Sequence, residues 1–162
     1  MLLLTHYSRY CSLATLAFVM LVLSGCSGES NQSDGLAMGQ EPYLRYCASC
    51  HGNNGEGKSP AFPPIAGSEW LAMGPESVAL IVLGGLSGEI EVAGQTYRGY
   101  MPPMRHVSDQ DITALMGFID DQWADWAEPI TQAQVTELRG KVGSRPIQGL
   151  EGLQALLEEI EQ

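Results

Sequence analysis

The chain has 162 residues, 19 of them acidic and 8 basic, with a formal net charge of −11 at pH 7. A chain of this length holds about one domain, which leaves no room for a separate catalytic domain. Because so acidic a surface repels polyanions, nucleic acid is excluded as a partner. The charge either only keeps the protein soluble or steers it toward basic patches on other proteins.

Residues 1–25 are predicted to be a signal peptide. Arg9 precedes the apolar run Cys11–Leu23, which is too short for a membrane span of about 20 residues but suits a signal-peptide core. The following Leu23-Ser24-Gly25-Cys26 resembles the lipobox of bacterial lipoproteins, which implies cleavage before Cys26 and lipidation of its sulfur. The alternative is an ordinary secretory signal. The lipoprotein hypothesis places the chain on the periplasmic side of a bacterial membrane, anchored through lipid on Cys26.

Small polar residues from 26 to 34 predict a flexible tether, and the domain is expected at 35–128. Its first helix is predicted over Gly39–Ser49. The Gly, Asn, Ser and Pro residues of 52–67 predict a loop. A second helix is expected at Pro75–Leu83, with proline in its first turn and Gly84 ending it. Apolar and polar residues alternate over Glu89–Arg98, which weakly predicts a β-hairpin.

The clearest helical pattern runs from Ser108 to about Trp126, with one apolar face and an N-cap serine. Thr131 and Gln134 predict a capping box at the start of another helix. A last amphipathic stretch carries Leu150, Leu153, Leu157 and Ile160. Residues 129–162 are therefore expected to form a C-terminal helical extension. The whole layout predicts an all-α fold arranged around a cofactor.

The strongest motif is Cys47-Ala48-Ser49-Cys50-His51. The C-x-x-C-H spacing lets two thiols add to the vinyl groups of haem while the histidine presents its imidazole to the iron. A zinc site would need a second ligand pair, and a thioredoxin motif would need alternating strands and helices. The chain therefore predicts one covalently bound haem c, held by Cys47 and Cys50 with His51 as an iron ligand.

The second axial ligand is predicted to be Met101, which lies in a turn containing two prolines. Met104 and His106 remain alternatives, as does an open site. Met116 belongs to the apolar face of a helix, where core packing is the usual role of methionine. A methionine opposite histidine keeps the iron six-coordinate and raises its reduction potential.

A histidine ligand needs an acceptor for its other ring nitrogen. The segment from Phe62 to Ile65, which contains Pro63 and Pro64, falls where a backbone carbonyl can accept that bond. Proline residues there would also hold the carbonyl in place.

Several segments together resemble the class I cytochrome c family, and more closely the bacterial monohaem domains that accompany periplasmic dehydrogenases and oxidases. They are Gly39-x-x-x-Tyr43-x-x-x-CASCHG, FPPIAGS, LGGLSGEIEVAGQTYRGYMPPM, VSDQDITALMGFIDDQW and ITQAQVTELRG. The resemblance implies helices around one haem, with the first and last core helices crossing near Gly39 and Phe118.

The resemblance also implies roles for single residues. Cys47 and Cys50 would hold the haem, with His51 and Met101 on the iron. The carbonyl of Pro63 would orient His51, with Pro64 as a rival.

More peripheral roles follow from the same resemblance. Ile65 would line the haem site beside the prolines. Three further side chains could reach the haem propionates: Tyr97, Arg98 and Trp70. A role at the surface or in the core is an equally good interpretation of each.

The expected function is single-electron transfer between redox proteins, a dehydrogenase or a terminal oxidase among them, and not catalysis. A free shuttle and a subunit of a larger complex are both compatible with this function. A haem enzyme such as a peroxidase, or a gas sensor, is the alternative. It would need an open distal site and usually a second haem, whereas the chain holds one C-x-x-C-H motif.

Overall fold

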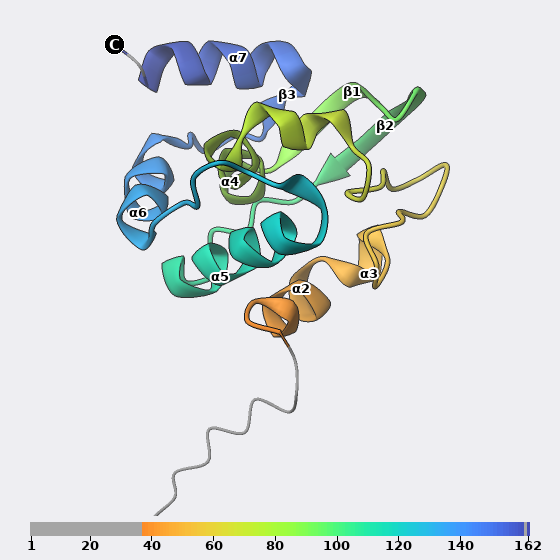
Figure 1. Cartoon of the computed structure of the whole chain (residues 1–162). Helices are drawn as coiled ribbons and strands as arrows, with labels where there is room; N and C mark the ends of the chain where they lie inside the picture. The colour runs from red at the N-terminus through yellow and green to blue at the C-terminus, as the bar shows by residue number, and fades with distance from the viewer. Residues whose placement is uncertain (1–36, 161) are drawn as a thin grey trace, which may run out of the picture. The chain divides into compact units, whose positions relative to one another are not determined.

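The computed structural model describes residues 37–160 and 162. The predicted signal peptide, the tether and Cys26 lie outside the described residues. Figure 1 shows the helices and the small sheet in chain order. Within the described part of the chain, no helix is long and apolar enough to cross a membrane.

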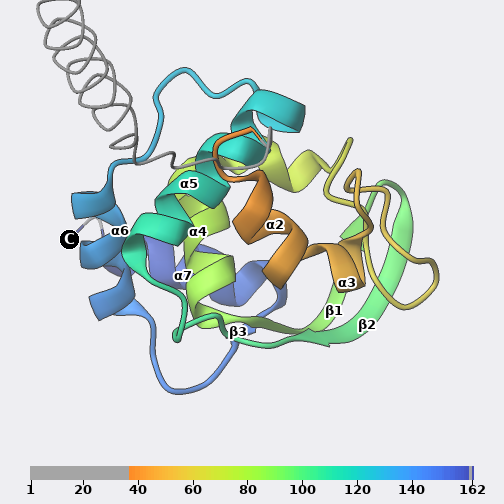
Figure 2. The same ribbon diagram turned by 90° about the horizontal axis from the view of Figure 1, so that it is seen from below.

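The chain enters the domain through two short helices, α2 (Gln40–Tyr46) and α3 (Ala48–His51). The single helix predicted here is thus broken at Cys47, whose φ of −114° departs from helical geometry. Helix α2 packs across α5 (Asp109–Ile119), as Figure 2 shows from below. A Cβ on Gly39 would lie 2.9 Å from the Phe118 Cβ, so the expected crossing at Gly39 and Phe118 is present.

Residues 52–67 form the predicted loop, and its own backbone bonds hold it closed. Gly57 N–H donates to the His51 carbonyl at 2.7 Å, and Ile65 N–H donates to the Gly55 carbonyl at 2.8 Å. A short 3-10 helix, η1 (Glu69–Met73), follows and was not predicted. The loop is therefore fixed directly behind the C-x-x-C-H motif.

Helix α4 (Pro75–Gly84) lies at the centre of the described domain. Pro75 occupies its first turn as predicted, where the missing N–H has no partner to lose. Every residue from 77 to 84 is buried, because η1, α5, α6 and α7 all pack around the helix. Ser77 is the one buried polar side chain among the described residues, and its hydroxyl donates to the Met73 carbonyl.

The hairpin is longer than its weak signal indicated. Strand β1 (Leu86–Val92) pairs antiparallel with β2 (Gln95–Met101), so that Leu86 faces Met101 in the register. Ala93 and Gly94 have φ of 51° and 72°, the left-handed pair that a tight hairpin turn requires.

A third strand, β3 (Ile147–Gln148), pairs parallel with β1 to complete the order β2-β1-β3. The fold is therefore mainly helical, as predicted, with one small sheet added to it.

Helix α5 begins at the predicted cap, where Ser108 Oγ accepts from the Asp111 N–H. It continues as the π-turn η2 (Asp120–Ala124) and ends at Asp125, which is left-handed with φ of 59°. The helix therefore stops just before Trp126, close to the predicted end.

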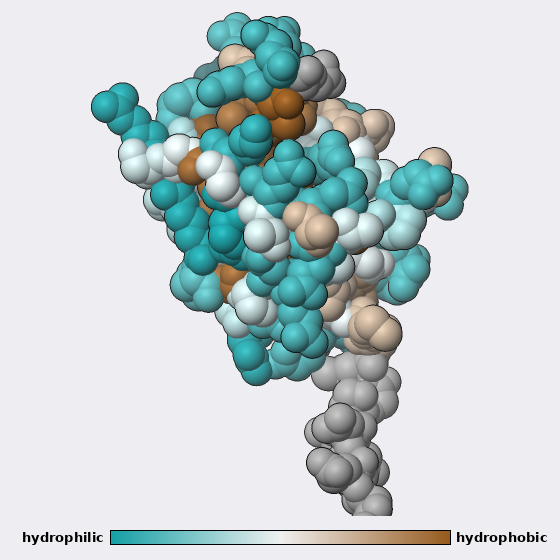
Figure 3. All heavy atoms as spheres, turned by 90° about the vertical axis from the view of Figure 1, so that its left-hand side faces the viewer, coloured by the Kyte–Doolittle hydropathy of each residue, from teal (hydrophilic) through white to brown (hydrophobic). Residues whose placement is uncertain are grey.

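The extension contains α6 (Gln132–Lys141) and α7 (Gly149–Ile160). The predicted capping box is present, with Thr131 and Gln134 bonded in both directions. Helix α6 packs on α4 and α5, and α7 packs on β1, β3 and α4. Figure 3 shows a largely hydrophilic face here, with apolar side chains gathered just below the outermost helix. Leu153 of α7 is fully buried, so the extension shares the core of the domain.

Candidate functional site: an apolar cavity between histidine and methionine

The C-x-x-C-H motif spans the break between α2 and α3. Cys47 is buried at the break, Cys50 follows one turn later, and His51 is the last residue of α3. Residues three and four apart share a helix face, so the two sulfurs and the imidazole reach one side of the chain. The two cysteines are not joined by a disulfide.

The imidazole of His51 is held by a backbone carbonyl. Its Nδ1 lies 2.8 Å from the Pro63 oxygen, and because a carbonyl only accepts, Nδ1 must carry the proton. Burial lowers the pKa of His51, although the bond to Pro63 opposes this shift. The ring is therefore neutral near pH 7, which leaves the lone pair on Nε2 free for a metal ion. The bond is made by Pro63 and not by its rival Pro64.

Two neighbouring cavities open from this histidine. The outer cavity takes in ≈ 730 Å³ of empty space, part of it open solvent, and reaches the surface at Ala61, Phe62, Tyr100 and Pro102. The inner cavity takes in ≈ 670 Å³ of empty space, part of it open solvent. Aliphatic side chains of η1, α4 and α5 line it, together with half-buried Ile65 and Trp70. Six residues line both cavities: Cys47, His51, Pro63, Leu86, Ile90 and Met101. The two cavities are thus parts of one hollow.

The methionines differ in their relation to this hollow. Met101, at the end of β2, lines both cavities, whereas Met104 lines only the outer one. Met116 is 1% exposed in the core, as its helical spacing predicted. His106 lines neither cavity and lies with its ring edge-on to Tyr46. Met101 is therefore the methionine that shares the whole hollow with His51.

The residues present fit a haem. The lining is mostly carbon, with the two cysteine sulfurs and His51 on one wall and Met101 also in the lining. A large, flat, apolar macrocycle attached through two thioethers matches such a hollow in chemistry. Burial, and secondarily Cys50, raises the pKa of the Cys47 thiol to about 12, so the free thiol would be neutral.

Comparison with known proteins agrees with this fit. The family model for cytochrome c matches residues 36–123, more than half of the chain. The chain belongs to the cytochrome c family. It is therefore a monohaem cytochrome that binds haem c covalently and carries electrons, either alone or as an electron-transfer subunit.

Two kinds of curated protein are similar to this cytochrome. Cytochrome c-552 of Thermus thermophilus is 39% identical over 119 residues, which cover 66% of this chain and 80% of that protein. The cytochrome c subunit of the quinone alcohol dehydrogenase of Gluconobacter oxydans is 32% identical over 105 residues. That match covers 62% of this chain but only 22% of the subunit. The cytochrome thus corresponds to most of the first relative and to a small part of the second.

Three of the other four predicted site residues line the hollow. Ile65 and Trp70 line the inner cavity of the cytochrome, and Tyr97, 4% exposed, lines the outer one. The single N–H of Trp70 already donates to the Glu91 carbonyl at 2.9 Å, so it is not free for a propionate. Arg98 lines neither cavity and pairs with Glu89 on the exposed hairpin.

Sequence reasoning missed two residues that shape the site. Leu86 lines both cavities opposite Met101 in the hairpin register. The preceding Gly85, with φ of 73°, lets the chain pass close to Pro103, because a Cβ there would lie 2.8 Å from the Pro103 nitrogen. The Gly84-Gly85 pair was the available signal, since a helix stop needs only one glycine.

Proposed function

We propose that Cys47 and Cys50 hold the haem by thioether bonds, with His51 Nε2 and Met101 sulfur as the axial ligands of its iron. The observation that carries the proposal is that His51 and Met101 line the same two apolar cavities. The Pro63 carbonyl supports it further, because it fixes the tautomer that leaves Nε2 unprotonated.

The haem supplies one-electron chemistry when bound. The chain's part is to keep the axial groups in place and to exclude water, and the aliphatic inner wall serves that purpose. With both axial positions taken by side chains, no position remains for a substrate. The function is therefore the transfer of one electron at a time. The cytochrome accepts the electron from a reduced donor and passes it to an oxidised acceptor.

Substituting the methionines tests the ligand set. The Met101→Ala protein should lose the long-wavelength absorption band of ferric iron bonded to a thioether, and it should bind imidazole more tightly. Met104→Ala is the matched control, since Met104 lines only the outer cavity. Loss of the band in Met104→Ala alone would move the ligand to Met104. A wild-type protein without the band would support the alternative of a haem enzyme or gas sensor.

Electrons are proposed to pass at the mouth of the outer cavity. Tyr100 is 60% exposed there and Phe62 is 37% exposed, which makes an apolar rim. An apolar rim excludes water when a partner docks, and weak redox complexes use small contacts of this kind.

We further propose that the partners include a periplasmic dehydrogenase, by analogy with the quinone alcohol dehydrogenase whose cytochrome c subunit is similar. A terminal oxidase is the other expected partner. Copurification from detergent-solubilised membranes, followed by identification of the associated subunits, tests the pairing. Isolation of the cytochrome alone, reducible by no dehydrogenase of the same membranes, would contradict it.

The lipobox Leu23-Ser24-Gly25-Cys26 supports a lipid anchor on Cys26 and a place on the periplasmic face of the membrane. Mass spectrometry of the membrane-extracted protein should find a diacylglyceryl group on an N-terminal Cys26. The Cys26→Ser protein should be released from the anchor and still bind haem. An unmodified Cys26 in the wild-type protein would contradict the anchor but not the electron carrier.

A further inference from the structure

The side chain of Arg139 connects the C-terminal extension to the loop that follows Met101. Arg139 lies on α6, beyond residues 36–123 that match the family. Its Nη1 donates to the Arg105 carbonyl and its Nη2 to the Val107 carbonyl, each at 2.8 Å. Its Nε donates to Asp109 at 2.7 Å. One guanidinium thus holds three residues of a five-residue stretch.

The 102–108 loop, which ends just before Asp109, is also held by the core, because Val107 is 2% exposed and Met104 packs against the core. No helix or strand covers residues 102–108. Within it, Met104 N–H donates to the Val82 carbonyl at 2.9 Å and Val107 N–H donates to the Met104 carbonyl at 3.1 Å. Three successive hydrogen bonds, through Val107 and Met104, therefore link Arg139 to Val82 of α4, and Met104 is three residues from Met101.

A second arginine links the loop to the C-terminal extension in the opposite direction. Arg105 donates from its own guanidinium to the Gly143 carbonyl, just after α6. The Arg139 and Asp109 side chains are 26% and 20% exposed, so water screens their charges only in part. The Thr136 hydroxyl, also on α6, donates to the other Asp109 oxygen at 2.6 Å.

The chemistry of this contact is specific to arginine. Three acceptors surround one planar group, and a guanidinium presents five N–H donors in a fixed fork. A lysine would keep the charge but could not reach two carbonyls and a carboxylate in this geometry.

We infer that Arg139 is a positioning residue, which keeps the 102–108 loop closed over the hollow so that Met101 stays at the iron. The inference rests on the proposed function, because it takes Met101 as the axial ligand. Without Arg139 the loop opens more often, and an added ligand then competes better with the methionine.

Imidazole binding to the ferric full-length protein tests this role. Arg139→Gln should bind imidazole roughly tenfold more tightly than wild type, because the open population rises by that factor. Arg139→Lys should resemble Arg139→Gln. Asp109→Asn, which leaves the arginine in place, should shift the affinity in the same direction and serves if Arg139→Gln does not fold.

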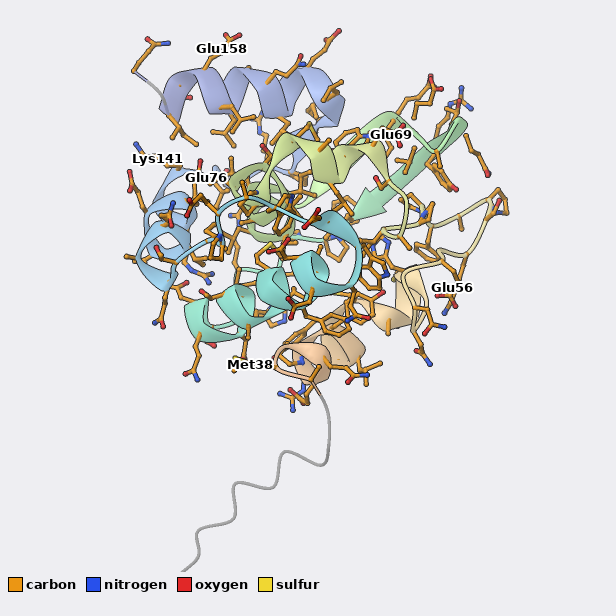
Figure 4. All side chains as sticks on the ribbon, in the orientation of Figure 1. Met38, Glu56, Glu69, Glu76, Lys141 and Glu158 are labelled. Carbon is orange, nitrogen blue, oxygen red and sulfur yellow. The ribbon has the colours of Figure 1, made fainter. Side chains whose placement is uncertain are left out.

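The matched control is Glu76→Ala. Glu76 lies on α4 beside α6 and accepts from the Gln134 side chain at 3.0 Å (Figure 4). Its loss removes another contact of α6 without touching the 102–108 loop, so imidazole affinity should stay at the wild-type value. A wild-type affinity in Arg139→Gln and in Asp109→Asn, or the same gain in Glu76→Ala, would overturn the inference.

The outcome is distinguishable from failure of the proposed function. If Met101→Ala leaves the thioether band intact, the ligand assignment fails whatever Arg139 does. If Met101→Ala removes the band while Arg139→Gln binds imidazole as wild type does, only the role of Arg139 fails.

Discussion

Gly39 lies where α2 passes over α5, and two separate constraints act on it. Its φ is 85°, and a Cβ would run into the Ala114 carbonyl. Gly67 has a similar φ of 73° but no atom within 4 Å of the Cβ position. Comparing Gly39 with Gly67 therefore separates two effects of an added Cβ on the free energy of unfolding, backbone strain and steric crowding.

Alanine at these two positions should have unequal effects. Gly67→Ala should lower the free energy of unfolding by about 1–2 kcal/mol through backbone strain alone. Gly39→Ala should cost about 1–3 kcal/mol more, because the crossing helices must move apart. Urea unfolding of both variants checks this. Equal losses would mean that the crossing tolerates a methyl group.

His51 predicts a pH dependence of stability. Burial lowers its pKa in the folded protein below the ordinary value of 6.5, and iron ligation lowers it in the same direction. The unfolded chain thus binds a proton that the folded one does not. The contribution of His51 to the free energy of unfolding is complete above pH 6.5. It falls by up to about 1.4 kcal/mol per pH unit as the pH drops from 6.5 to the lowered pKa of the folded protein.

Urea unfolding between pH 7.5 and 5 measures this slope before the carboxylates titrate. His106→Gln is the control, because His106 is exposed and lines neither cavity. The slope should be unchanged in that variant. A flat profile in the wild-type protein would contradict a neutral, half-buried His51.

At the scale of elements, the start of α6 depends on the capping box of Thr131 and Gln134. Thr131→Ala should cost about 1 kcal/mol, because the Gln134 N–H loses its acceptor at the helix end. Gln132→Ala removes an exposed side chain of the same turn and should be nearly neutral. Thermal unfolding compares the two, and equal midpoints would show that the box contributes nothing.

Elements with a local signal were predictable. A proline, a cap or apolar periodicity in the sequence predicts each of the helices α4, α5, α6 and α7. All four are confirmed. Strand β3 has only two residues and exists because the Ile147 N–H donates to the Gly85 carbonyl, far away in the chain. No local pattern encodes such a pairing.

The site shows the same division. The C-x-x-C-H motif needs residues adjacent in the chain, so its position could be read directly. The contact of Arg139 with Asp109 spans 30 residues and depends on how α6 packs on α5. An arginine near a helix C-terminus is otherwise an ordinary surface residue.

At the scale of the whole molecule, the formal charge of −11 governs encounters at low ionic strength. Acidic side chains project on several sides, as Glu56, Glu69 and Glu158 show in Figure 4. At about 0.01 M salt, where screening extends over roughly 30 Å, a small cationic redox reagent should react faster than a matched anionic one.

Stopped-flow rates across a salt series test this effect. The preference for the cation should shrink toward about 0.1 M, where the screening length falls to roughly 10 Å and charges close to the cavity mouth dominate. The nearby Lys58 is a local cation of that kind. A preference for the anion at low salt would contradict steering by the net charge.

The loop at 52–67 bears on how fast the cytochrome can work. The loop is held by its internal backbone hydrogen bonds and by the bond from the His51 imidazole to the Pro63 carbonyl. These bonds leave the histidine side of the site little freedom to shift. We therefore expect little nuclear rearrangement on that side when the bound haem gains or loses an electron. A small reorganisation energy makes for rapid exchange, even when the driving force between two partners is slight.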